Sequence, residues 1–153
     1  MASVTLSQNG DTYTFVMDLV KALPKEGTPL AKGVRVAEWA IWIDPEPWNP
    51  VLNPVAPLAR IALFYDGSVY SASVLDYATM DTVQPESFSH EGSTVVLVFS
   101  AESIGNLQFT WWCPLVHLYL GPMGSGGTIF VDSIDYDATE GQVYGDLPWP
   151  PPA

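Results

Sequence analysis

The sequence predicts an all-β protein, a two-sheet antiparallel β-sandwich of eight or nine strands. Three observations support this fold class: short apolar runs alternate with turn residues, the 12 Gly and 14 Pro are scattered among those runs, and no amphipathic helix is visible. Many short strands joined by tight turns are typical of sandwiches. A length of 153 residues suits one domain. We expect one sandwich domain over residues 1–145 and a proline-rich tail over residues 146–153.

Turn dipeptides between alternating runs predict two tight hairpins. Asn9-Gly10 and Asp66-Gly67 each separate two such runs. These dipeptides favour two-residue hairpin loops because the loops need positive φ. The expected strands are Val4–Gln8, Thr12–Leu19, Val34–Ile43, Ala59–Tyr65, Ser68–Leu75, Ser87–His90, Thr94–Ser100, Gln108–Leu120 and Thr128–Tyr136.

Alternation within the strand at 34–43 predicts which side chains face the core. Trp39, Ile41 and Ile43 share one face, whereas Glu38 and Trp42 share the other. We expect the first set to be buried between the sheets. The second set then lies on the outer face of its sheet.

Two connecting segments and one strand have their own signals. Residues 44–57 contain five prolines, which exclude a central strand and predict a stiff surface loop. Loops of this length are often functional. Residues 101–104 predict one helical turn, closed by Gly105-Asn106. The strand at 108–120 contains Pro114, where we expect it to bend.

The charge is strongly negative and unevenly distributed. The formal net charge is −12, and residues 61–153 contain eleven acids but no Lys or Arg. Nucleic-acid binding depends on Lys and Arg that neutralise phosphates, so a nucleic-acid partner is not expected. Anionic membrane surfaces are disfavoured for the same reason. The basic residues are Lys21, Lys25, Lys32, Arg35 and Arg60.

Cysteine usage and hydropathy exclude further classes. The lone Cys113 forms no internal disulfide and no cysteine metal cluster, and we expect it to be a buried thiol. No apolar window is long enough to span a membrane, so membrane insertion is not expected. No signal peptide is visible in residues 1–10.

One stretch resembles a known family. Residues 89–112 run through a glycine turn, a β-run, a small helical turn, Gly-Asn and then Phe-x-Trp. This layout resembles the late strands of DOMON-like β-sandwich domains, which include the family 9 carbohydrate-binding modules. The resemblance implies a non-catalytic binding domain of a secreted or cell-surface protein, with sugar or haem as its ligand.

Two departures limit what this resemblance implies. Haem-binding members use a Met and a His as axial ligands, and no Met or His of this chain lies in an alignable match, so haem is not expected. Residues 128–135 instead resemble the last strand of jelly-roll carbohydrate-binding modules. The two resemblances imply different strand orders, so the sequence predicts a sandwich that is DOMON-like or jelly-roll-like.

Aromatic residues beside acids predict a sugar site. Sugars stack on aromatic rings, and carboxylates accept their hydroxyl protons. Trp48 and Trp149 lie in proline-rich segments that cannot be core strands. The alternative is that these rings only anchor loops to the sandwich. The predicted ligand-binding residues are Trp42, Trp48, Trp149, Glu38 and Asp44.

An acidic cluster near the C-terminus is a candidate cation site. Asp132, Asp135 and Asp137 could hold a structural calcium ion. In a strand, however, Asp135 and Asp137 fall on one face and Asp132 on the other. Solvated surface charge is the alternative reading, and we expect no other cofactor.

The sequence contains no catalytic motif. It has no Gly-x-Ser-x-Gly elbow, and no phosphate-binding glycine loop. We therefore expect a non-catalytic, extracellular or cell-surface binding module with carbohydrate as its ligand. The alternative is a structural or assembly domain of a surface layer, filament or particle, in which exposed strand edges pair between subunits.

Overall fold

The smaller of two antiparallel sheets has the strand order β1-β2-β8-β7. It is formed by β1 (Ser3–Asn9), β2 (Thr12–Asp18), β8 (Thr94–Ser100) and β7 (Ser87–Glu91). This computed structural model describes residues 3–44, 58–106, 109, 111–120, 128–133 and 147–148.

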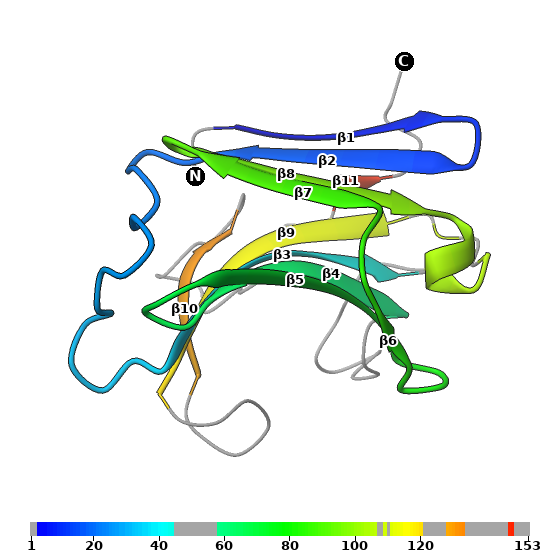
Figure 1. The fold of residues 1–153 in the computed structure, drawn as a ribbon. Helices are drawn as coiled ribbons and strands as arrows, with labels where there is room; N and C mark the ends of the chain where they lie inside the picture. Colours follow the sequence, from blue (N-terminus) through cyan, green and yellow to red (C-terminus); the bar gives the residue numbers. More distant parts are fainter. Residues whose placement is uncertain are drawn as a thin grey trace, which may run out of the picture.

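The larger sheet has the order β10-β9-β3-β4-β5-β6, and β11 also pairs with β9. The two sheets lie face to face, which confirms the predicted two-sheet sandwich (Figure 1). Nine of the described strands have five or more residues, as the sequence predicted. The strands of this sheet are β10 (Thr128–Ser133), β9 (Trp111–Tyr119), β3 (Val36–Asp44), β4 (Ala59–Tyr65), β5 (Tyr70–Asp76), β6 (Thr82–Val83) and β11 (Leu147–Pro148).

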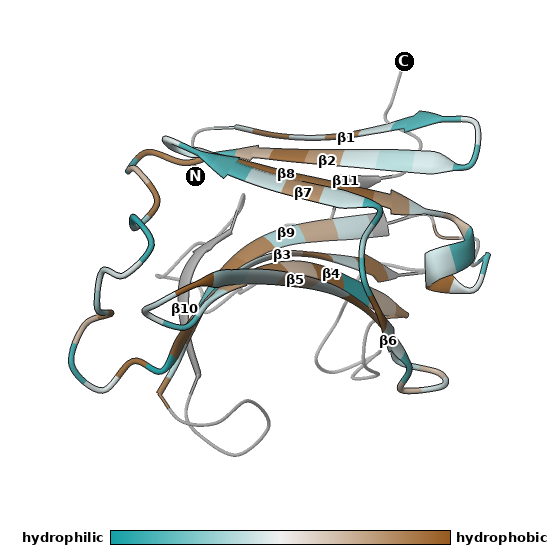
Figure 2. Ribbon diagram, viewed as in Figure 1, coloured by the Kyte–Doolittle hydropathy of each residue, from teal (hydrophilic) through white to brown (hydrophobic). Residues whose placement is uncertain are grey.

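The core lies between the sheets and follows the alternation of the strands. Figure 2 shows apolar residues along the strands of both sheets, with hydrophilic residues gathered at turns. The expected core face of β3 is confirmed, because Trp39, Ile41 and Ile43 are all buried. Their partners from the smaller sheet include Phe15 and Leu97, each fully buried. Each such side chain contributes roughly 1.5–3 kcal/mol to folding.

The central strands of the larger sheet are also buried on their other face. Ala40 of β3, Ala62 of β4 and Leu115 of β9 are fully buried and form a second apolar cluster with Phe64. A strand that is buried on both faces reads as a continuous apolar run. The sequence of β4, Ala-Arg-Ile-Ala-Leu-Phe-Tyr, fits this rule except at Arg60.

Both predicted hairpins form, but their loops differ from the prediction. Asn9 pairs with Thr12, so the two-residue loop is Gly10-Asp11, and only Gly10 has positive φ. A glycine first in the loop is the arrangement of a type II′ turn.

The second hairpin has a four-residue loop in place of the predicted two. The side-chain Oδ1 of Asp66 accepts hydrogen bonds from the backbone N–H of Ser68 at 2.8 Å and of Val69 at 2.9 Å. Tyr65 therefore pairs with Tyr70, and β5 begins two residues later than expected. Local Asp hydrogen bonds of this kind compete with strand pairing.

The helical turn predicted after β8 is present as a 3-10 helix, η1 (Glu102–Ile104). Gly105 follows it in the left-handed conformation, and its N–H donates to the carbonyl of Glu102. Ile104 points into the core and is fully buried. The turn therefore anchors the connection between the two sheets.

The last strands all pair with β9. Leu147 and Pro148 pair with Trp112 and Trp111, so part of the expected tail joins the larger sheet. The β10 strand pairs further along β9 and contains a bulge between Phe130 and Asp132. The described pairings leave Pro114 without a neighbour on this side, where a residue lacking N–H is tolerated.

Two tyrosines hold the long connection between β2 and β3. The hydroxyl of Tyr65 lies 2.7 Å from the carbonyl oxygen of Thr28 and 3.0 Å from that of Lys25. Its single proton is shared between these two acceptors in a bifurcated hydrogen bond. The hydroxyl of Tyr70 donates to the carbonyl of Pro24 at 2.6 Å. Burial, together with the neighbouring Tyr65 and then Glu26, raises the pKa of Tyr70 to about 12.

We predict that the stability of the protein falls between about pH 10 and pH 12 because of Tyr70. The unfolded tyrosine loses its proton near pH 10, whereas the folded one keeps it to about pH 12. The folded state then binds more protons than the unfolded state, so the free energy of unfolding decreases as pH rises through this window. Urea denaturation at pH 8 and pH 11.5 should show a smaller loss in Tyr70→Phe than in the wild type. An equal loss in both proteins would contradict this prediction.

Candidate binding site on the outer face of the large sheet

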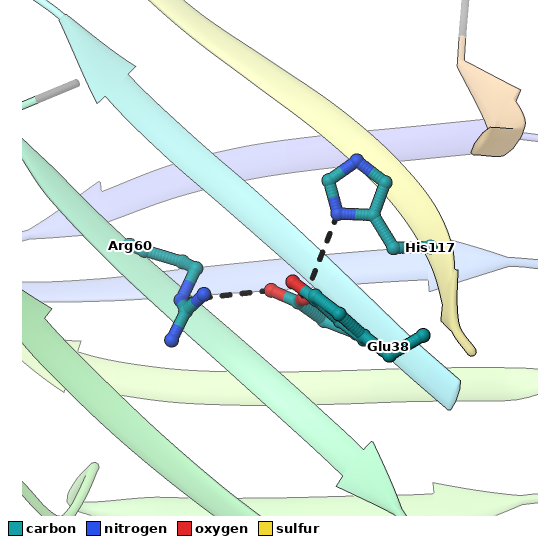
Figure 3. Close-up of polar contacts among 4 residues, drawn as sticks. Glu38, Arg60 and His117 are labelled. Atoms are coloured by element: carbon teal, nitrogen blue, oxygen red, sulfur yellow. Dashed lines mark hydrogen bonds and ion pairs between the residues drawn. The ribbon is translucent and has the colours of Figure 1, made fainter. Parts of the chain in front are cut away.

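A carboxylate lies fully buried on the outer face of the larger sheet. Glu38 is an even-numbered residue of β3 and points away from the sandwich core, as the alternation predicted. Figure 3 shows its carboxylate between Arg60 of β4 and His117 of β9. Oε1 lies 3.6 Å from Nε of Arg60, and Oε2 lies 3.6 Å from Nδ1 of His117.

Tyr119 completes what we call the Glu38 cluster, namely Glu38, Arg60, His117 and Tyr119. The Tyr119 hydroxyl donates a short hydrogen bond to Oε2 of Glu38. Burial, the negative charge of Glu38 and this hydrogen bond raise the pKa of Tyr119 well above its usual range. The phenol therefore remains a proton donor at any physiological pH.

Strand register explains how these side chains meet. Glu38 is paired directly with Phe64 of β4 on one side and with His117 of β9 on the other. Arg60 is paired with Trp42, which lies four residues beyond Glu38 on the same face of β3. Its side chain runs back over the Phe64 ring, 5.4 Å from the ring centre, and so reaches Glu38.

Aromatic rings surround the charged groups. The rings of Trp42 and His117 meet edge to face with centres 5.7 Å apart, and those of His117 and Tyr119 do so at 5.9 Å. Edge-to-face contacts add a modest attraction to the burial of the rings. Trp42 and Tyr119 are both partly exposed, so they form the accessible part of the site.

The ion pair fixes the position of a cation that is slightly exposed. The Glu38 side chain is fully buried, whereas the Arg60 side chain is 15% exposed. A buried carboxylate is tolerated only when it is paired and hydrogen-bonded. Arg60 supplies the pairing and Tyr119 the hydrogen bond, and the ion pair holds the guanidinium group over the Phe64 ring.

The predicted ligand-binding residues are only partly brought together. Glu38 and Trp42 share the outer face, but Glu38 lies beneath the surface as an anchor and is not exposed to a ligand. Asp44 ends β3, and its side chain lies outside the described residues. Trp48 and Trp149 lie outside them altogether.

The predicted cation site is described only at its first residue. The backbone of Asp132 lies in β10, while Asp135 and Asp137 lie outside the described residues. Among the residues that the structure describes, no three His, Cys, Asp or Glu side chains gather in a way that could hold a metal ion.

Three members of the Glu38 cluster were absent from the predicted site. Arg60 interrupts an otherwise apolar strand, and His117 does the same in β9. A lone charged or titratable residue in a strand buried on both faces signals a buried partner. An isolated polar residue of this kind, considered together with strand alternation, could have predicted that Arg60 and His117 lie near Glu38.

Comparisons with known proteins place no further constraint on this site. No protein-family model, no curated protein and no solved structure matches this chain. Within the described part of the chain, no helix has the length and apolar character needed to cross a membrane.

We predict that Glu38→Ala lowers the free energy of unfolding by about 3 kcal/mol. Removing one partner of a buried ion pair leaves the other charge uncompensated, at a cost of about 3–5 kcal/mol. Urea denaturation at pH 7 measures the change. Glu86→Ala, which removes an exposed glutamate, is the matched control and should change stability by less than about 0.5 kcal/mol. Equal effects of the two substitutions would show that the cluster does not stabilise the fold.

Proposed function

We propose that this protein is a non-catalytic, extracellular or cell-surface binding module for carbohydrate, and that the sugar binds on the outer face of the larger sheet. The observation that carries this proposal is the partly exposed ring of Trp42, which lies against His117 on the same outer face as the fixed guanidinium group of Arg60. Aromatic rings offer a surface to the apolar face of a sugar. A fixed guanidinium group offers several N–H donors to its hydroxyl oxygens.

The rigidity of Arg60 supports a binding role. Ordering a long side chain when a ligand binds costs about 0.5–1.5 kcal/mol. Glu38 and the Phe64 ring already restrict Arg60. Most of that cost is therefore met during folding, which favours the recognition of weakly binding ligands such as sugars.

The shape of the sheet supports the same face. Figure 1 shows β3, β4 and β5 as arched strands, with the smaller sheet on the convex side of the arch. The outer face that carries the Glu38 cluster is therefore the concave side. Small-molecule sites are generally concave, with a few fixed polar groups among apolar ones.

The chemistry of the cluster favours binding over catalysis. Hydrolysis of a glycoside generally needs two carboxyl groups on either side of the scissile bond. Glu38 is the one carboxylate among the described members of this cluster, and it is buried beneath Arg60 and Tyr119. The resemblance of residues 89–112 to DOMON-like domains also supports a non-catalytic module that acts outside the cell.

A second candidate function is assembly, and one observation favours it. The β7 strand is an edge of the smaller sheet in the described topology, and it contains neither Lys nor Pro. Edge strands without such residues are prone to pair with another chain. Phe88 on this strand is 37% exposed.

We predict that Trp42→Ala weakens binding to polysaccharide at least about fivefold. The substitution removes the stacking surface, which is worth about 1 kcal/mol or more. Affinity electrophoresis in gels that contain neutral polysaccharides, after a glycan-array screen, measures the effect. Phe88→Ala removes an exposed ring elsewhere and is the matched control, and Trp42→Phe should retain part of the affinity. Unchanged binding in a folded Trp42→Ala protein would remove this face from the proposal.

We also predict that the protein is a monomer in solution, which separates the two candidate functions. Light scattering coupled to size exclusion measures its mass with and without Phe88→Lys. A monomer in both cases supports a binding module. An oligomer that Phe88→Lys dissociates, in a protein that binds no glycan, would establish assembly in its place.

A further inference from the structure

A shallow hollow lies next to the Glu38 cluster on the β4–β5 hairpin. Its volume is about 330 Å³. Phe64 belongs to both features, because its ring packs under Arg60 and also lines the hollow. The hollow is therefore continuous with the proposed sugar-binding face. The lining residues used below are Val36, Phe64, Asp66, Ser71, Ser73 and Gln84.

The lining combines an apolar surface with polar groups that can accept and donate hydrogen bonds. Val36 and Phe64 supply the apolar part. Ser71 and Ser73 are alternate residues of β5 on the outer face of the sheet, and neither hydroxyl bonds to another described residue. Gln84 adds an exposed amide, with both donors and an acceptor.

Asp66 gives the hollow a fixed negative charge. Its Oδ1 accepts the N–H groups of Ser68 and Val69, which leaves Oδ2 available to a ligand. The same backbone hydrogen bonds, led by that of Val69, hold the pKa of Asp66 below its usual value. A carboxylate that stays ionised accepts hydroxyl protons and repels anionic ligands.

Resting on the proposed function, we propose that this hollow is the subsite for one neutral hexopyranose unit. A pyranose has an apolar C–H face and a ring of hydroxyl groups, which match the apolar lining and the polar side chains of the hollow. A volume of about 330 Å³ is near the lower end of small-molecule sites, about 300–1,000 Å³. It therefore suits one sugar unit and not a long oligosaccharide. Asp66 and the net charge of −12 exclude uronic acids and sulfated sugars.

Chemical-shift mapping of the full, isotope-labelled chain tests the subsite. The probes are methyl α-glucopyranoside, methyl α-mannopyranoside and methyl β-galactopyranoside, with glucuronate as the anionic comparison. We expect at least one neutral probe to shift the backbone signals of Phe64, Asp66 and Ser71–Ser73, while glucuronate leaves them unchanged. Shifts confined to other strands, or stronger binding of glucuronate, would overturn the proposal.

Matched serine substitutions test the polar lining. The double substitution Ser71→Ala with Ser73→Ala should weaken binding of the neutral probe about tenfold, because each substitution removes one hydrogen bond to the sugar. Ser87→Ala with Ser89→Ala is the matched control, since these residues are alternate, exposed serines of a strand in the other sheet. The control should bind as the wild type does, and equal binding in both double variants would overturn the subsite.

Asp66→Asn tests the charge without removing the turn. The asparagine keeps an oxygen that accepts the same backbone N–H groups, so the loop is retained. We expect this variant to bind glucuronate at least about threefold more tightly than the wild type, and unchanged exclusion of glucuronate would contradict the role given to Asp66.

The proposed function and the subsite can fail separately. Polysaccharide binding that depends on Trp42 but not on Ser71 and Ser73 overturns the subsite alone. If polysaccharide binding is retained but no methyl glycoside shifts the signals of the hollow, the subsite alone is again overturned. The absence of all glycan binding overturns both proposals.

Discussion

The burial of Glu38 is the constraint on which the outer face of the larger sheet depends. An ionised carboxylate without partners is too costly to hold inside a protein. Arg60 of β4 forms an ion pair with this carboxylate, and Tyr119 of β9 donates a hydrogen bond to it. His117, also on β9, lies against it. These contacts tie β4 and β9 to β3 through side chains as well as through the backbone. They also fix which residues can reach the surface above Glu38.

Burial on both faces of the central strands makes this arrangement possible. The inner face of β3 and β4 packs against the smaller sheet, and the outer face contains fully buried Ala40 and Ala62. Small residues at these positions let long neighbours lie flat along the sheet. Arg60 can therefore cross the Phe64 ring and still be only slightly exposed. The polar side chains on this face have little freedom to move, because strand register fixes their backbone positions and rotamer preferences restrict their side chains.

Local patterns in the sequence predicted the strands well and the site only in part. Alternation placed Glu38 and Trp42 correctly on one face, because that depends on β3 alone. The partners of Glu38 depend on how β3 pairs with strands that lie far away in the sequence, which no local pattern determines. The loop at Asp66-Gly67 is longer than predicted for a different reason: the Asp66 side chain accepts hydrogen bonds from two backbone N–H groups. Specific side-chain contacts, not propensities, decided both outcomes.

The uneven distribution of charge along the chain affects the electrostatics of this face. Arg60 is the last Lys or Arg in the sequence, and residues 61–153 contain neither. Its charge is largely balanced by Glu38, so it can donate hydrogen bonds without attracting anions strongly. Asp66, at the edge of the neighbouring hollow, then adds an unbalanced negative charge. Selectivity arises from repulsion as well as attraction, and here the repulsion falls on anionic ligands. A neutral, hydroxyl-rich ligand, the class that we propose, is compatible with both the balanced cation and the fixed carboxylate.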